Sequence, residues 1–265
     1  MEGKKERMVV PEIQATTDGT ATLYRADLDE HYHSVKGALS ESEHVYINLA
    51  FNHFLNFASD MADPSEERGD TLAIEDKEEA SGAARKDADS GLKGVRVFEV
   101  GFGTGLNAAL TALEAERSRV RVTYYSIELY PLPPEVIEDF VGQYPPDIAR
   151  MLRAVNSARW NLPVKINDFF TLHKIEANLI EADLPGNVDV VYFDAFAPEK
   201  QPELWSECIF TKIHDAMTPG AILTTYCAKG AIRRLLQSLS FLTERLPGPP
   251  AGKREVLRAT KKHTL

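Results

Sequence analysis

A glycine-rich turn between a strand and a helix constrains the fold of this chain more than any other feature. Residues 98–107 read FEVGFGTGLN, an apolar run followed by alternating glycines and the start of a helix-length segment. Glycine lets the backbone turn sharply and approach a ligand closely, and a helix N-terminus offers free N–H groups. The pattern predicts an α/β fold with a ligand at this turn. The residues expected to hold that ligand are Gly101, Gly103, Thr104, Gly105 and Asn107.

Two other interpretations of the turn stay open. It could hold a dinucleotide pyrophosphate, or it could be a tight turn that binds no ligand. Dinucleotide-binding turns usually space their glycines as G-x-G-x-x-G, whereas this turn reads G-x-G-x-G. The spacing therefore favours a nucleoside ligand of another kind.

From Gly94 onward, short apolar runs alternate with helix-length segments, which is typical of parallel strands joined by crossover helices. The last two expected strands are separated by the turn PGPP at 247–250, so we expect them to form an antiparallel hairpin at the sheet edge. The sequence thus predicts a Rossmann-like α/β fold with a seven-stranded, mostly parallel sheet. The expected strands are Val95–Val100, Val122–Glu128, Pro163–Asn167, Val188–Phe193, Ala221–Tyr226, Phe241–Leu246 and Glu255–Thr260.

Two stretches of different character precede this alternating pattern. Residues 12–25 place Asp18-Gly19 between segments rich in Thr, Ile, Leu and Tyr, which indicates a β-hairpin. Residues 60–93 hold eleven acidic and five basic residues and no aromatic ones, which is typical of a mobile surface segment. The predicted organisation is an N-terminal extension over 1–59, an acidic mobile insertion over 60–93 and one α/β domain over 94–265.

Acidic side chains follow three of the expected strands. Glu128, about 25 residues after the glycines, could accept hydrogen bonds from both hydroxyls of a ribose. Asp168 could accept from an adenine amino group, with the ring of Phe169 near the base, although an N-cap role fits Asp168 equally well. Asp194 should face the same crevice as the glycine turn, where a carboxylate can orient an amine and take up its proton. A turn aspartate that bonds its own loop is the alternative for Asp194.

Charge and composition limit which partners the chain can have and which cellular compartment it can occupy. The net charge of −10 argues against a nucleic-acid partner, but residues 226–265 hold nine basic and two acidic side chains. That segment is either a solvated face or a surface for a polyanion. No apolar run approaches the roughly 18 residues of a membrane span, and the N-terminus lacks the pattern of a signal peptide. Two cysteines fit a reducing compartment and suggest no metal site, so we expect a cytoplasmic protein.

Several motifs together resemble those of the tRNA 5-aminomethyl(-2-thio)uridine methyltransferases, a domain of the bifunctional enzyme that makes 5-methylaminomethyl-2-thiouridine. The glycine turn is shared by many methyltransferases, whereas the combination of all the motifs is specific. The matching stretches are DEHYHS at 29–34, GA at 37–38, ESEHVYI at 41–47, FEVGFGTGLN at 98–107, DAFAP at 194–198 with Trp205, YCAKG at 226–230 with Arg233 and Arg234, PGPP at 247–250 and GKRE at 252–255.

The resemblance implies a class I methyltransferase fold, S-adenosyl-L-methionine as cofactor, and methylation of the 5-aminomethyl nitrogen of wobble uridine in the anticodon stem-loop of tRNA. It implies that the glycine turn holds the methionine end of the cofactor, that Glu128 holds its ribose, and that Asp194 engages the substrate amine. Tyr32 and Ser34 would cover the cofactor site. The residues expected to face the substrate or the tRNA are His33, Phe196, Lys229, Arg233, Arg234, Lys253 and Arg254.

Two departures from the family pattern limit these expectations. The sequence stops at Leu265 without a flavin-dependent oxidase domain, so we expect only the methylation step, and the acidic insertion could repel tRNA. The alternative functions are an aminopropyltransferase like spermidine synthase, a small-amine N-methyltransferase, and a non-catalytic RNA-binding module. Uptake of the cofactor and the identity of the accepting amine would distinguish them.

Overall fold

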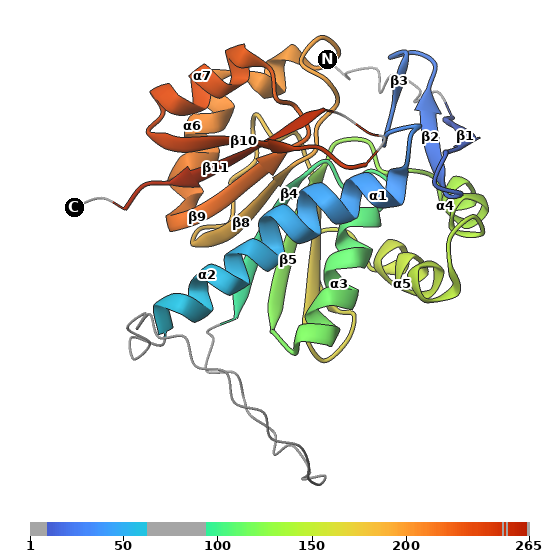
Figure 1. The fold of residues 1–265 in the computed structure, drawn as a ribbon. Coiled ribbons are helices and arrows are strands. Elements are labelled where there is room, and N and C mark those ends of the chain that lie inside the picture. The colour runs from blue at the N-terminus through green and yellow to red at the C-terminus, as the bar shows by residue number, and fades with distance from the viewer. Residues whose placement is uncertain (1–9, 63–93, 251, 253, 264–265) are drawn as a thin grey trace, which may run out of the picture.

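An eight-stranded sheet lies at the centre of the part of the chain that the structure describes, residues 10–62, 94–250, 252 and 254–263 of a computed structural model (Figure 1). Its strand order is β10-β11-β9-β8-β4-β5-β7-β6. The five central strands from β9 to β7 are parallel, whereas β11 and β6 run antiparallel to their neighbours. The strands are β4 (Val95–Val100), β5 (Val122–Glu128), β6 (Pro163–Lys165), β7 (Phe170–Glu176), β8 (Val188–Phe193), β9 (Met217–Thr225), β10 (Phe241–Pro247) and β11 (Glu255–Lys261).

The predicted Rossmann-like α/β fold is confirmed, but the sheet has eight strands where seven were predicted, and the third parallel strand was misplaced. β4, β5 and β8 have the predicted bounds, and β10 and β11 form the predicted antiparallel hairpin. The third parallel strand, however, is Phe170–Glu176, and the segment predicted for it holds only the short antiparallel strand β6 at the sheet edge. The strand was missed because FTLHKIE mixes apolar residues with His173 and Lys174, and the neighbouring segment PVKIN at 163–167 has a similar mixture of apolar and polar residues.

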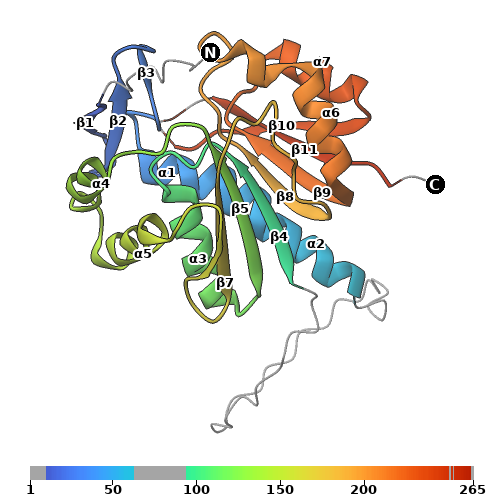
Figure 2. The ribbon, with the colours of Figure 1, turned by 180° about the vertical axis from the view of Figure 1, so that it is seen from behind.

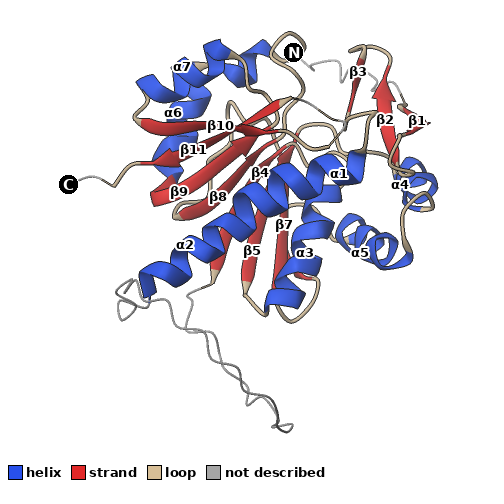
Figure 3. Cartoon of the chain, in the orientation of Figure 1, coloured by secondary structure: helices blue, strands red, loops and turns tan. Residues whose placement is uncertain are grey.

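Helices cover both faces of the sheet, as the two opposite views show (Figures 1 and 2). A continuous helical segment crosses one face together with α3 and α5, while α6 and α7 cover the other face (Figure 3). α4 and α5 each begin at a proline, which loses nothing at the first helical position because the N–H there has no partner within the helix. The helices are α1 (Ala38–Ser42), a π-helix (Glu43–Asn52), α2 (His53–Ala62), α3 (Leu106–Ser118), α4 (Pro134–Val141), α5 (Pro146–Ser157), a 3₁₀ turn (Pro202–Trp205), α6 (Glu207–Ala216) and α7 (Gly230–Ser238).

The core is divided by the sheet into two apolar layers, because alternate side chains of each strand point to opposite faces. In β8, Val190 and Tyr192 pack on the side of α3 and the π-helix. Val191 and Phe193 pack on the side of α6 and α7. Burial on both faces explains why the central strands β4 and β8 are mostly apolar, which made them predictable from the sequence.

A small antiparallel sheet precedes the large one. The predicted hairpin is confirmed as β1 (Glu12–Ala15) and β2 (Ala21–Arg25), and Gly19 in its turn has φ +80°. A third strand, β3 (Glu30–His31), was not predicted. The hydroxyl of Tyr144 donates a 2.7 Å hydrogen bond to the carbonyl of Ala21 and ties this sheet to the segment between α4 and α5.

The predicted acidic insertion lies largely outside the described residues. Its first three residues, 60–62, continue helix α2, and residues 63–93 are not described. Within the described part of the chain, none of the helices has both the length and the apolar character that crossing a membrane requires.

Candidate active site

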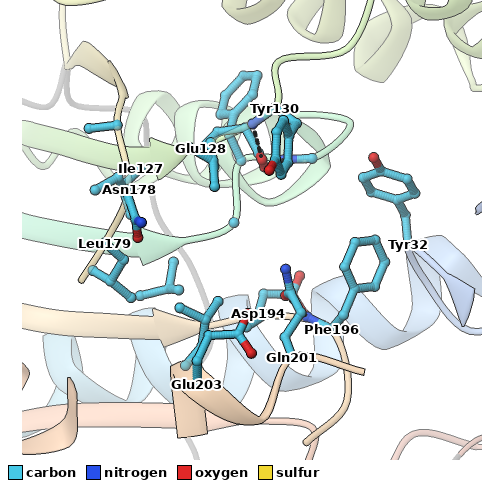
Figure 4. A pocket seen from close by; sticks show the side chains of 18 of the residues that line it. Tyr32, Ile127, Glu128, Tyr130, Asn178, Leu179, Asp194, Phe196, Gln201 and Glu203 are labelled. Atoms are coloured by element: carbon cyan, nitrogen blue, oxygen red, sulfur yellow. Dashed lines mark hydrogen bonds between the residues drawn. The ribbon is translucent and has the colours of Figure 1, made fainter. Parts of the chain in front are cut away.

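The carboxyl ends of β4, β5, β7 and β8 open into a first pocket of about 210 Å³. Figure 4 shows Glu128 and Tyr130 along one side of it, Asp194 and Gln201 along the opposite side, and Tyr32 beside Phe196 at one end. The lining consists of residues 100–103 at the end of β4, 127–130 at the end of β5, 177–180 after β7, and 194–196, 201, 203 and 204 after β8, with Arg25, Tyr32 and His33 from the N-terminal extension.

Two glycines let the turn after β4 approach its neighbours. Gly101 has φ +88°, and a Cβ placed on it would lie 2.9 Å from the backbone oxygen of Asp194. Gly103 has φ +49°, and its Cβ would lie 2.9 Å from the ring of Tyr32. Glycine is the residue that adopts these backbone conformations without strain and leaves this space open. Both glycines line the first pocket, as predicted for the ligand turn.

The remaining residues of the turn do not line the first pocket, and their predicted role as cofactor contacts remains a prediction. Thr104 is buried, and its hydroxyl bonds His33 Nε2 at 2.9 Å. Gly105 is packed against the ring of Phe102, and Asn107 donates to Asp194. None of Thr104, Gly105 and Asn107 is among the described residues that line this pocket. They support the turn and its neighbours.

Glu128 is held at the end of β5 with its carboxylate beside the glycine turn. Its Oε2 accepts a hydrogen bond from the Gly103 N–H at 3.2 Å, and its Oε1 accepts one from the Tyr130 N–H at 2.9 Å. Burial raises the pKa of this carboxyl, while these backbone hydrogen bonds and the charge of Arg25 oppose the rise. The side chain of Glu128 is suitably placed to bind a ribose. That role remains a prediction.

Asp194 follows β8 and is the point where several elements converge. Tyr46, from the π-helix, donates a 2.6 Å hydrogen bond to Oδ1, and Asn107, from α3, donates a 2.8 Å hydrogen bond to Oδ2. Tyr46 is 1% exposed, and burial together with the charge of Asp194 raises its pKa well above 10. Tyr46 is not among the predicted site residues, because it lies 148 residues from Asp194 in the sequence and its own segment looks apolar.

The loop after β8 is fixed by polar contacts on both sides. Tyr226 donates to the carbonyl of Ala195 at 2.9 Å. The side chain of Gln201 accepts a hydrogen bond from the N–H of Phe196 at 3.1 Å. The indole of Trp205 donates to the carbonyl of Phe196 at 2.8 Å. These bonds explain the spacing from DAFAP to Trp205, because each partner must reach the same short loop.

A second pocket of about 600 Å³ lies on the other side of the loop after β8. It shares five residues with the first pocket, and these form the wall between the two. The rings of Tyr32 and Phe196 meet edge to face within this wall, with centroids 5.0 Å apart. The shared residues are Tyr32, His33, Asp194, Ala195 and Phe196, and the second pocket adds Glu30, His31, Ser34, Val35, Glu41, Ala197, Pro198, Tyr226, Cys227, Ala228, Lys229, Arg254 and Glu255.

The segment after β3 contributes to both pockets, as the covering role predicted for it requires. Tyr32 and His33 line both, whereas Ser34 lines only the second pocket. His33 bonds Thr104 on the glycine turn, and the Ser34 N–H donates to Glu41 Oε2 at 2.9 Å. The segment is thereby attached to both the turn and helix α1.

Asp168 and Phe169 line neither pocket, so the structure does not bring the two residues predicted for adenine to the site. They precede β7 and therefore lie at the amino ends of the parallel strands. Asp168 is exposed and pairs with Lys165, and the ring of Phe169 lies under the guanidinium of Arg119. The segment that does follow β7, residues 177–180, lines the first pocket instead.

The predicted tRNA-facing residues are only partly brought together. Lys229 and Arg254 line the second pocket, and Lys229 forms an ion pair with Glu199. Arg233 and Arg234 lie on α7, and Lys253 is outside the described residues. In the described ranges no three His, Cys, Asp or Glu side chains form a group that could hold a metal ion.

A buried carboxyl lies beneath the site on β4. Glu99 is 0% exposed, and the Ser126 hydroxyl donates to its Oε2 at 2.6 Å. Burial, with a further contribution from the charge of Asp194, raises its pKa from 4.5 to about 8. Glu99 is therefore neutral at pH 7 in the folded protein and ionised in the unfolded chain.

This difference predicts a pH-dependent stability. The folded state retains a proton that the unfolded state releases above pH 4.5, so the free energy of unfolding falls as pH rises toward about 8. Between these values Glu99 contributes a slope of roughly 1.4 kcal/mol per pH unit. Glu99→Gln should remove this slope, as measured by urea unfolding from pH 5 to 9, whereas exposed Glu135→Gln should retain it. Parallel curves for wild type and Glu99→Gln would contradict the assignment.

Comparison with known protein families agrees with this geometry. A family model described as S-adenosyl-L-methionine-dependent methyltransferase matches residues 134–262. The bifunctional protein MnmC of tRNA 5-methylaminomethyl-2-thiouridine biosynthesis from Pseudomonas fluorescens is 31% identical over 174 residues, which are 61% of this chain and 26% of that protein. MnmC from Leptospira borgpetersenii is 30% identical over 171 residues, with the same shares. The chain thus spans about a quarter of the length of these curated relatives.

A solved structure extends the similarity to nearly the whole chain. The crystal structure of MnmC2 from Aquifex aeolicus has a TM-score of 0.66 and 22% identity, and the match covers 98% of this chain and 73% of that one. At this identity it supports the fold. The family resemblance and the class I methyltransferase fold inferred from the sequence are both confirmed. Residues 134–262 of this chain match the family of S-adenosyl-L-methionine-dependent methyltransferases.

Proposed function

We propose that this chain uses S-adenosyl-L-methionine to methylate the 5-aminomethyl nitrogen of wobble (2-thio)uridine in tRNA, giving 5-methylaminomethyl(-2-thio)uridine. The observation that carries the proposal is that two pockets meet at one carboxylate, Asp194, on a methyltransferase fold. The curated relatives are named for the biosynthesis of this nucleoside in tRNA, which supports the choice of substrate.

The first pocket fits the cofactor by the character of its lining. The open space over Gly101 and Gly103 lets the backbone approach a ligand, and Glu128 offers a carboxylate at the end of β5 to the ribose hydroxyls. Asn178 and Leu179, after β7, lie on the side where the adenine would then be expected. When bound, the cofactor supplies an electrophilic methyl group on its sulfonium.

The second pocket suits a cationic acceptor. An aminomethyl nitrogen is an ammonium in water, and the carboxylates of Asp194 and Glu41 both line this pocket. The nitrogen must lose a proton to present a lone pair, and Asp194, in the wall between the pockets, is placed to take that proton. Tyr32 and Phe196 would order an unpaired base, since aromatic rings stack on the bases of single-stranded RNA.

The tRNA would approach through the mouth of the second pocket. Lys229 and Arg254 lie there, and Arg233 and Arg234 on α7 belong to the same basic C-terminal part of the sequence. Basic side chains hold the phosphates of the backbone, whereas the pocket reads the extruded base. An anticodon stem-loop presents both features, because its wobble base is unpaired.

The direct test is transfer of a labelled methyl group from S-adenosyl-L-methionine to total tRNA from cells that lack this gene. Nucleoside mass spectrometry should find the label in 5-methylaminomethyluridine or its 2-thio form. Total tRNA from cells that carry the gene is the control and should accept little label, since its sites are already methylated. No label in either tRNA, despite measured cofactor binding, would reject the proposal and direct the search to polyamines and small amines.

A further inference from the structure

The helical segment that crosses the sheet contains an unusual stretch next to Asp194. Residues Glu43–Asn52 form a ten-residue π-helix between α1 and α2. π-helical hydrogen bonding is rare and occurs mostly as single-turn bulges, often at functional sites. Tyr46 lies in the first part of this stretch and is buried against the sheet.

The hydroxyl of Tyr46 and the amide of Asn107 hold the two oxygens of one carboxylate. Tyr46 donates to Asp194 Oδ1 at 2.6 Å, and Asn107 donates to Oδ2 at 2.8 Å. Because the donors come from different helices and bind different oxygens, rotation of the carboxylate would break both hydrogen bonds. The pair therefore sets the plane in which Asp194 faces the two pockets.

Packing leaves the ring of Tyr46 little freedom to turn away. Its centroid lies 5.2 Å from that of Tyr192, which in turn lies 6.0 Å from that of Tyr124, and all three side chains are almost fully buried. Burial and the negative charges of Asp194 and Glu41 raise the pKa of Tyr46 well above 10, so its hydroxyl remains a donor at any physiological pH.

Tyr46 does not reach either cavity. It is not among the described residues that line the first or the second pocket, so it would touch neither cofactor nor acceptor. Any influence on the reaction must pass through Asp194.

We propose that Tyr46 is a positioning residue for methyl transfer, which fixes the orientation of Asp194 and stabilises its ionised form. The inference rests on the proposed function for the role of Asp194, and on the two hydrogen bonds for the role of Tyr46. A carboxylate that accepts a strong hydrogen bond is favoured in its charged form, the form that binds an ammonium and then accepts its proton.

The test compares Tyr46→Phe with Tyr192→Phe. The two rings are in contact, and each change removes one buried tyrosine hydroxyl. The hydroxyl of Tyr192, however, forms its hydrogen bond with Thr111 and not with Asp194. Tyr46→Phe should lower kcat roughly 10- to 100-fold, the range for losing a hydrogen bond to a charged group, with the affinity for S-adenosyl-L-methionine unchanged. In the pH–kcat profile of Tyr46→Phe, the acid limb should move to higher pH, because the ionised carboxylate of Asp194 has lost a hydrogen-bond donor. Tyr192→Phe should leave that limb in place.

A second substitution keeps the test valid if Tyr46→Phe does not fold. Site-specific 3-fluorotyrosine at position 46 retains the ring and makes the hydroxyl a stronger donor, so the acid limb should move to lower pH. An unshifted limb in either folded protein, or an equal shift in Tyr192→Phe, would overturn the inference. If the wild type methylates no tRNA, the proposed function fails separately, and the same proteins are compared on the amine that does accept the methyl group.

Discussion

Asp194→Asn is expected to lower kcat for methyl transfer by roughly 10²- to 10⁴-fold, the usual contribution of a general acid or base. The amide keeps the shape of the side chain and can still accept from the Tyr46 hydroxyl. It carries no negative charge to attract an ammonium and cannot take up its proton. Because the other strand ends that line the first pocket are untouched, the affinity for S-adenosyl-L-methionine, measured by calorimetry, should change little.

A matched control for this change lies on the same strand. Asp189, near the opposite end of β8, accepts hydrogen bonds from the backbone N–H of Arg96 and the Thr218 hydroxyl, of which an asparagine oxygen can retain one, and it lines neither the first nor the second pocket. Asp189→Asn should therefore retain the activity of the wild type. Full activity in Asp194→Asn would show that another group removes the proton from the acceptor nitrogen.

Gly101→Ala is expected to weaken cofactor binding and, with it, methyl transfer. The new Cβ would lie 2.9 Å from the backbone oxygen of Asp194, and the φ of +88° is strained for any residue other than glycine. The clash can be relieved only by separating the turn after β4 from the loop after β8, and both segments line the first pocket. We expect Kd for S-adenosyl-L-methionine to rise at least tenfold, corresponding to about 1.4 kcal/mol of lost binding free energy.

Gly142→Ala is the control for a general effect of replacing glycine. Gly142 follows α4 with φ −59°, and the nearest atom to its added Cβ would be 3.6 Å away, an ordinary contact. This variant should bind the cofactor and transfer methyl groups like the wild type. Wild-type affinity in Gly101→Ala would mean that the turn has room to move and does not hold the ligand as closely as its backbone suggests.

The sequence predicts the middle of the sheet well and its edges less well. β4, β5 and β8 are buried on both faces, so their apolar runs have clear limits. β7 is buried too, but it carries Lys174, whose ammonium donates to the Asn156 carbonyl at 2.8 Å and lies 4.6 Å from the ring centroid of Trp160. A lysine whose partners come from another part of the chain cannot be recognised locally as a buried strand residue.

The error in one strand explains the error in the site. Placing the third strand at residues 163–167 put its carboxyl end at Asp168, whereas the true strand ends at Glu176. The side chains beyond that end, Asn178 and Leu179, occupy the place predicted for Asp168 and Phe169. Tyr46 was missed for a different reason, because a hydrogen bond across 148 residues leaves no local pattern.

The assembly of the wall between the two pockets has a consequence for folding kinetics. The wall joins Tyr32 and His33 to residues that follow β8, and the Tyr46–Asp194 bond closes a loop of 148 residues. Closing long loops costs chain entropy that is recovered only after the distant partner is in place. During refolding, the N-terminal extension can therefore complete the wall only after β8 has joined the sheet, so secondary structure should return before catalytic competence.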